Sequence, residues 1–172
     1  MKDLNVYQRI NLVHKKITSV TKDNEVSFGS DSYQTISHDA VTAALHLPIA
    51  EAGIVVIPNI ETYSLESFEK TREWQGKTQT ILWYKADLKV SVTFVNIDNP
   101  EDKFSVSCPS YAFDTSDKAI GKAYSMAIKT IMLKTFMLES KDMEEDRKFE
   151  GGSFNQKPNY SNVKNYAPTA KK

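Results

Sequence analysis

Four polar residues on one predicted helix could together bind phosphate groups. They are Lys118, Lys122, Ser125 and Lys129, and on a helix that turns about 100° per residue they fall within roughly 60° of one another. Ammonium and hydroxyl groups in one stripe can neutralise and hydrogen-bond the phosphates of a nucleic-acid backbone. The opposite side of the helix is apolar and partly made of alanine, which allows close packing on a sheet.

The total charge of the chain gives no support to nucleic-acid binding, because 22 Lys and Arg residues balance 22 Asp and Glu residues. A basic stripe on a neutral protein can still bind phosphate, since the position of the charges matters as well as their sum. The alternative is that these lysines only keep a surface helix solvated. The sequence leaves both interpretations open.

Two carboxylates, Asp114 and Asp117, precede the stripe. Acidic residues at a helix start interact favourably with its positive end. The alternative is a paired-carboxylate metal site, but no third carboxylate or histidine stands nearby to complete the ligands. The one cysteine, Cys108, excludes an intrachain disulfide and a multi-cysteine zinc site. No nucleotide-binding loop and no Ser/His/Asp arrangement is present. We therefore expect no metal, no cofactor and no enzymatic activity.

Two helices are predicted before the middle of the chain. Apolar residues at steps of three and four predict a helix over residues 3–20, with Asp3 as its N-cap. After a polar stretch at 21–32, a second helix starts at the cap Ser37 and ends at Gly53. Pro48 lies inside it and predicts a kink or a break.

The middle of the chain has the alternation of β-strands. Every even residue from 82 to 94 is apolar while most odd ones are polar, the period of two that a half-buried sheet needs. The neighbouring segments add two strands before it and one after it. We expect strands at 54–57 (stopped by Pro58), 62–69, 82–94 and from Phe104 to Cys108, with a loop at 70–80 and a turn at 98–102.

The predicted fold is α+β: an antiparallel β-meander packed against a long helix at 118–141, with N-terminal helices and a disordered C-terminal tail. Residues 1–148 would form the core domain, and 149–172 a flexible tail rich in Lys, Asn and Pro. No apolar stretch reaches the ~20 residues of a membrane span, and the N-terminus does not look like a signal peptide. We therefore expect a soluble, intracellular protein without a membrane partner.

The segment from residue 111 to 129 resembles the signature of the Erf (essential recombination function) family of phage proteins. The family pattern has an aromatic, a small residue and an acid, then Asp-Lys, Gly-Lys-Ala, a Ser-aromatic-Ala segment and a Leu-Lys-x-Phe ending. The corresponding residues here are Tyr111-Ala112-Phe113-Asp114, Asp117-Lys118, Gly121-Lys122-Ala123, Ser125-Met126-Ala127 and Leu133-Lys134-Thr135-Phe136. Residues 6–11, 38–41 and 53–58 also resemble the family, so the likeness spans about 4–142. It departs at Ser110 and Ala112, where the family has glycines, and at Met126, where it has tyrosine.

The resemblance implies single-stranded DNA binding and ATP-independent annealing of complementary strands in phage homologous recombination. The protein would work in the cytoplasm of the host bacterial cell, as a homo-oligomer in a ring or a helical filament. A β-hairpin and the long helix would define a basic groove, and many subunits would multiply a few phosphate contacts each. The apolar helix end at 132–138 favours such assembly. The predicted DNA-binding residues are Lys118, Lys122, Ser125, Lys129, Lys85, Lys89 and Tyr111.

Other classes remain open. A single-strand DNA-binding module without annealing would stack bases on aromatic residues of the sheet, namely Trp83, Tyr84, Tyr111 and Phe113. The alternation places Tyr84 in the core and Trp83 in solvent. A metal-dependent nuclease and a passive oligomeric scaffold are the remaining alternatives. The tail can contact DNA loosely or present a short motif to a host single-strand-binding protein, or it is only a solubilising extension.

We predict that deletion of residues 150–172 leaves folding, assembly and annealing of bare strands largely intact. All periodic segments lie before this tail, so its loss removes no core contact. Circular dichroism and annealing of bare and protein-coated strands would check this. A deletion variant that cannot anneal bare strands would contradict it.

Overall fold

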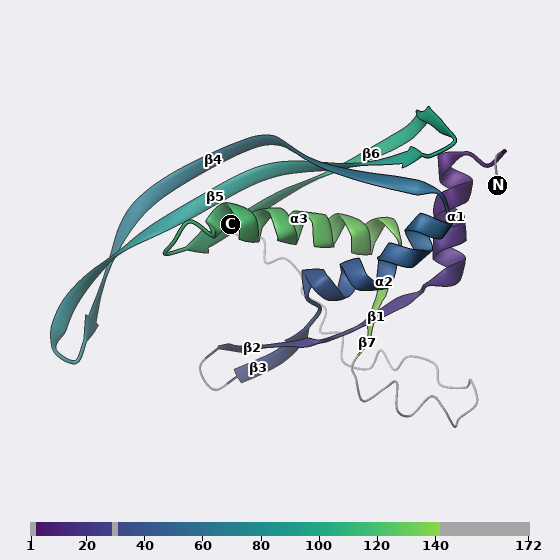
Figure 1. Ribbon diagram of the computed structural model, residues 1–172. Coiled ribbons are helices and arrows are strands. Elements are labelled where there is room, and N and C mark those ends of the chain that lie inside the picture. The colour runs from purple at the N-terminus through teal and green to yellow at the C-terminus, as the bar shows by residue number, and fades with distance from the viewer. Residues whose placement is uncertain (1–2, 29–30, 142–172) are drawn as a thin grey trace, which may run out of the picture.

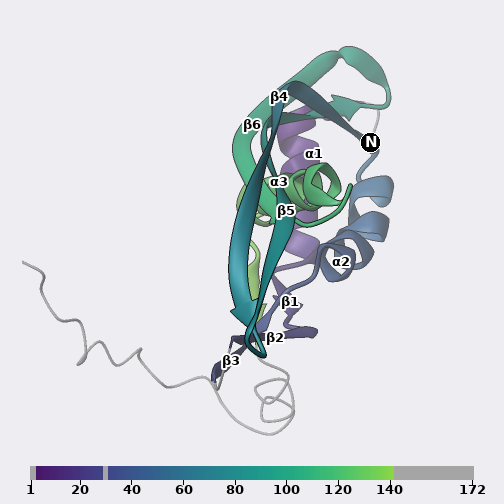
Figure 2. The ribbon, with the colours of Figure 1, turned by 90° about the vertical axis from the view of Figure 1, so that its left-hand side faces the viewer.

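The computed structural model describes residues 3–28 and 31–141. Within this part the protein is a mixed α/β structure with three helices and an antiparallel sheet in the order β4-β5-β6. The sheet curves over α3, and α2 lies on the other side of α3 (Figures 1 and 2). The antiparallel meander is therefore confirmed. The helices are α1 (Val6–Lys16), α2 (His38–Glu51) and α3 (Ala119–Thr135), and the strands of the sheet are β4 (Ile54–Trp74), β5 (Lys77–Asn96) and β6 (Asn99–Asp114).

The central strand β5 follows the predicted alternation over its inner half. Its even residues from Ala86 to Phe94 are at most 4% exposed, and they face the helices. Leu82 lies beyond this covered half and is exposed, which shows that the same pattern continues where no helix covers it. The strand is longer at both ends than the predicted 82–94.

The two hairpins are tighter than predicted. β4 does not stop at Pro58 but continues to Trp74, because an edge strand tolerates a residue without an N–H group. The predicted loop at 70–80 is a two-residue turn of Gln75 and Gly76, with φ of 51° and 72°. Two positive φ angles are typical of the turn that matches strand twist. The turn predicted at 98–102 is likewise only Ile97 and Asp98.

The helix ends are set by local hydrogen bonds. Asn5, and not Asp3, caps α1, because its side chain accepts from the Gln8 N–H while the Gln8 side chain accepts from the Asn5 N–H. Ser37 caps α2 as predicted. The helix continues through Pro48, so the predicted break is absent, and Gly53 follows it with φ of 69°.

The last helix is shorter than the predicted 118–141. α3 ends at Thr135, and Met137 turns the chain with a φ of 50°. The following residues form β7 (Glu139–Lys141), which pairs in parallel with β1 (Ser19–Thr21). The predicted tail and the domain boundary at 148 lie outside the described residues. None of the described helices is long and apolar enough to cross a membrane.

A short hairpin occupies the polar stretch for which no element was predicted. β2 (Asn24–Phe28) pairs antiparallel with β3 (Asp31–Thr35), and the pair lies below α2 in the view of Figure 1. Its strands carry few apolar residues, so the pattern of a half-buried sheet is missing from the sequence. This hairpin forms one wall of the cleft described below.

The core has two parts. The larger cluster joins all three helices to one end of the sheet, and the smaller one packs Ala119, Ala123 and Ala127 of α3 against β5. Ile131 and Phe136 belong to the larger cluster and are at most 2% exposed. The apolar end of α3, from which assembly was predicted, is therefore partly covered by the chain itself.

Arg9 is a buried charged residue that links three elements. Its side chain is 1% exposed and donates to the carbonyl of Leu4 (3.0 Å), to those of Ala52 and Gly53 (2.9 and 3.2 Å) and to the Asp98 carboxylate (2.5 Å). The start of α1, the end of α2 and the β5–β6 turn thus converge on one guanidinium group. A side chain at Gly53 would meet this group, since an ideal Cβ there lies 2.1 Å from Arg9 Nη1.

We predict that Gly53→Ala destabilises the protein far more than Gly76→Ala. Both glycines have a positive φ, which costs a residue with a Cβ about 1 kcal/mol. Only Gly53→Ala also displaces Arg9, because no atom lies within 4 Å of a Cβ at Gly76. Displacing the buried guanidinium deprives its N–H donors of their acceptors, which adds about 1–3 kcal/mol. Urea unfolding of the two variants would measure the difference, and equal losses would contradict the role given to Arg9.

Candidate nucleic-acid interface

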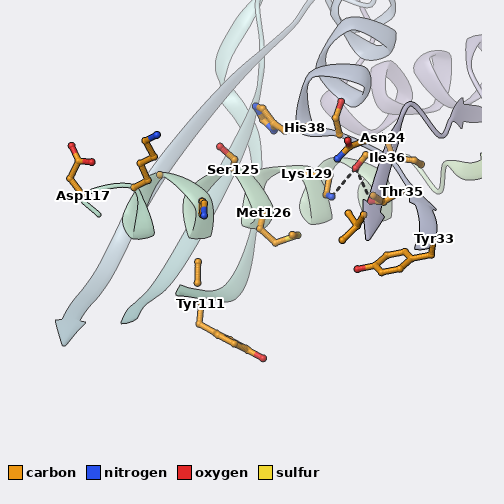
Figure 3. Close-up of a pocket in the computed structure, with 16 residues that line it drawn as sticks. Asn24, Tyr33, Thr35, Ile36, His38, Tyr111, Asp117, Ser125, Met126 and Lys129 are labelled. Carbon is orange, nitrogen blue, oxygen red and sulfur yellow. Dashed lines mark hydrogen bonds between the residues drawn. The ribbon is translucent and has the colours of Figure 1, made fainter. Parts of the chain in front are cut away.

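A cleft of about 860 Å³ runs along the basic face of α3. Its other walls are the β2–β3 hairpin, the start of α2 and the end of β6, and Figure 3 shows Tyr33 and Tyr111 at its outer side. Lys118, Lys122, Ser125 and Lys129 all line it, so the structure brings the predicted helix stripe together. The remaining lining residues are Asn24, Val26, Tyr33, Thr35, Ile36, Ser37, His38, Tyr111, Ala112, Asp117, Gly121 and Met126.

Lys122 is held at the cleft by an ion pair with Asp114. The Lys122 side chain is 56% exposed, whereas that of Asp114 is 10% exposed. Asp114 also accepts from the hydroxyl and the backbone N–H of Ser116, at 2.6 and 2.9 Å. The hydrogen bond from Lys122, followed by those from Ser116, lowers the pKa of Asp114 from 3.8 to about 2. This carboxylate therefore positions a lysine.

Lys129 fixes α3 to the segment between β3 and α2. Its ammonium donates to the carbonyl of Ile36 at 2.8 Å, as the dashed line in Figure 3 shows. The next residue, Ser37, donates its hydroxyl and its N–H to Asp23 at 2.6 and 2.7 Å. These bonds lower the pKa of Asp23, and the charge of Lys129 contributes to the same shift.

The cleft keeps an excess of positive charge. Three ammonium groups line it against one carboxylate, Asp117, with Asp114 behind Lys122. Each ammonium has three N–H donors, so Lys122 and Lys129 can bind a second acceptor while they keep their protein partners. Lys118 stands at the N-cap position of α3, is exposed and makes no side-chain capping bond.

The two predicted strand lysines lie elsewhere. Lys85 and Lys89 occupy odd positions of β5 and point to the sheet face away from α3. Lys85 pairs with Asp87 at 2.7 Å, and the hydrogen bond from this pair raises the pKa of Lys85. Lys89 pairs with Glu61 at 2.7 Å and lowers the pKa of that carboxyl group. The structure therefore does not join them to the α3 stripe.

Tyr111 lies at the boundary between the two surfaces. It lines the rim of the cleft, but its ring packs against Phe113 with centroids 6.0 Å apart. Its side chain is 65% exposed.

Sequence reasoning missed the wall opposite α3. Asn24, Tyr33 and Thr35 come from the β2–β3 hairpin, and His38 from the first turn of α2. Tyr33 pairs with Val26 across the hairpin and is 61% exposed. A single apolar pair in two short polar strands is too weak a signal to predict a hairpin.

The described residues contain no group of three His, Cys, Asp or Glu side chains placed to hold a metal ion. No protein-family model matches the chain, and no curated protein matches it significantly. The structural support for a function therefore comes from the surfaces of the molecule alone.

We predict that Asp114→Asn reduces stability at neutral pH and that this difference disappears in acid. The folded pKa of Asp114 lies below its ordinary value, so its contribution is fully present above pH 3.8 and is lost as the pH falls towards about 2. Urea unfolding of both proteins across this pH range would test it. Asp117→Asn, which removes an exposed carboxylate nearby, is the control for a simple change of net charge.

Proposed function

We propose that the protein binds single-stranded DNA and anneals complementary strands without ATP, in phage homologous recombination in the host bacterial cytoplasm. The observation that carries the proposal is the cleft along α3, which gathers Lys118, Lys122, Ser125 and Lys129 on one wall. It agrees with the resemblance of residues 111–129 to the Erf signature. We propose no cofactor and no enzymatic step.

The chemistry of the cleft suits a strand held by its backbone. Ammonium groups bind phosphates of any sequence, which annealing requires because base edges must stay free to pair. Met126 and Tyr33 are exposed beside these lysines and offer apolar contact to sugars or bases. Three lysines per chain make few phosphate contacts, so useful affinity requires several copies.

We therefore propose a homo-oligomer, as a ring or a filament. The edge strand β4 supports this proposal, because Tyr63 and Leu65 on it are 69% and 49% exposed. Exposed apolar residues on an unpaired strand edge favour contact with another chain. A long helix packed across the sheet of each subunit, and a host single-strand-binding protein as partner of the tail, complete the proposal.

The second candidate is single-strand DNA binding without annealing. The observation that favours it is that Trp83, Phe113 and Tyr111 share the open face of the sheet, while Tyr84 lies on the other face. Both candidates predict binding, and only an annealing assay separates them.

We predict that Lys118→Glu weakens binding of single-stranded DNA at least about tenfold and that wild-type affinity falls steeply as salt rises. A glutamate at a helix start is favourable, so the fold should survive. Lys118 is a better position for this test than Lys129, because Lys129 also donates a hydrogen bond to the Ile36 carbonyl and its replacement would disturb the fold. The matched control is Lys134→Glu, the same charge reversal at an exposed position near the other end of α3.

Gel shifts with a labelled strand, followed by addition of its complement without nucleotide, would measure both steps. Salt-independent binding, or equal losses from the two variants, would reject the cleft as the DNA site. Binding without annealing would favour the second candidate, and a strict requirement for nucleotide would reject the proposed class.

A further inference from the structure

The sheet face that points away from α3 carries a row of aromatic residues across all three strands. Phe68 of β4 pairs directly with Trp83 of β5, and Lys85, two residues after Trp83, pairs with Phe113 of β6. Residues two apart on a strand share a face, so the row continues through Phe113 to Tyr111. Three consecutive strands thus place four aromatic rings on one face of the sheet.

The ring contacts agree with this register. Phe113 meets Phe68 edge to face, with centroids 6.1 Å apart, and meets Tyr111 in the same way at 6.0 Å. These three side chains nevertheless remain 41%, 43% and 65% exposed for Phe68, Phe113 and Tyr111. The rings therefore support one another without forming a closed core, and a flat ligand can still reach them.

The charge on the ribbon formed by β4 and β5 differs between its two faces. Beyond the last β5–β6 pair, Tyr84 with Asp114, these strands continue alone as a ribbon past α3 (Figure 1). The register places the basic residues Lys70, Arg72 and Lys77 on the aromatic face and the acidic residues Glu69 and Glu73 on the other. The Lys70 ammonium lies 5.9 Å from the centre of the Trp83 ring.

Acidic groups on the aromatic face lie nearer the core. Asp87 pairs with Lys85, and Glu66 lies opposite Lys85 in the register. The positive end of this face is therefore the outer ribbon. We define Phe68, Trp83, Phe113 and Tyr111, together with Lys70 and Arg72, as the aromatic face.

We propose that the aromatic face binds single-stranded nucleic acid by stacking unpaired bases on its rings, with phosphates near Lys70 and Arg72. Every base has a flat π surface, so such stacking needs no particular sequence. Cations beside aromatic rings match the alternating bases and phosphates of a single strand. The inference rests on the proposed function and adds a second contact surface, which recognises bases where the α3 cleft binds the backbone.

The test compares oligo(dT) with an abasic strand of the same length. Loss of one stacked base costs at least about fivefold in affinity, so the wild-type chain should bind oligo(dT) at least about fivefold more tightly. Phe68→Ala with Phe113→Ala should remove this preference. Thr71→Ala with Leu82→Ala is the matched control, because these exposed residues lie on the opposite face of the same two strands. In a Trp74→Phe background, Trp83 fluorescence should be quenched by oligo(dT) and much less by the abasic strand.

The outcomes separate this inference from the proposed function. Lys118→Glu should weaken binding of both strands and leave the preference for oligo(dT). Loss of the aromatic rings should weaken binding of oligo(dT) alone and so remove that preference. Equal wild-type binding of the two strands, or a preference that survives loss of Phe68 and Phe113, would reject the aromatic face while the α3 cleft stands. The aromatic face would also be rejected as a DNA site if the double variant changed only the sedimenting mass of the protein. In that case the face would join copies of the chain. A wild-type chain that binds neither strand would reject both.

Discussion

The buried guanidinium of Arg9 is the constraint on which the rest of the described structure depends. A guanidinium has five N–H donors and no acceptor, so burial requires carbonyl or carboxylate partners on several sides. Leu4, Ala52, Gly53 and Asp98 provide them. Neighbouring bonds extend the network, since Asn96 donates to Leu4 and Asp102, and Asp102 accepts from the Val6 N–H. One end of the sheet is thereby fixed to α1 and to the end of α2.

The two proposed binding surfaces lie away from this fixed end. Small residues of α3 allow it to lie close to β5, so the lysines on its opposite side reach the cleft beside the β2–β3 hairpin. The sheet itself separates the cleft from the aromatic face. The phosphate backbone of a nucleic acid would then be bound on one side of the sheet and its bases on the other. Tyr111 of β6 would lie between the two surfaces.

The sequence predicts those elements whose residues alternate between core and solvent or make a local hydrogen bond. The alternation of β5 and the cap at Ser37 are present, because one face of that strand is buried and the Ser37 hydroxyl accepts the Ala40 N–H. The sequence does not show that the strand continues through Pro58, because an edge position cannot be recognised from one strand alone. Residues 139–141 form a strand and not the predicted helix end, and local sequence does not show this because their pairing partners are at 19–21, far away in sequence. At the site, helix spacing placed the four α3 residues correctly, whereas the opposite wall depends on a hairpin with almost no apolar pattern.

The pairing of β1 with β7 joins the two ends of the described chain, and this affects the order of folding. β4, β5 and β6 are consecutive, so each of their pairings joins segments that are neighbours in the chain. By contrast, the bond between the His14 ring and the Thr135 carbonyl joins residues 121 positions apart, and the β1–β7 pairing lies beside it. Closing so large a loop costs entropy before any contact is gained. We therefore expect the meander to form early and the docking of the N-terminal segment on the end of α3 to be the slow, final step.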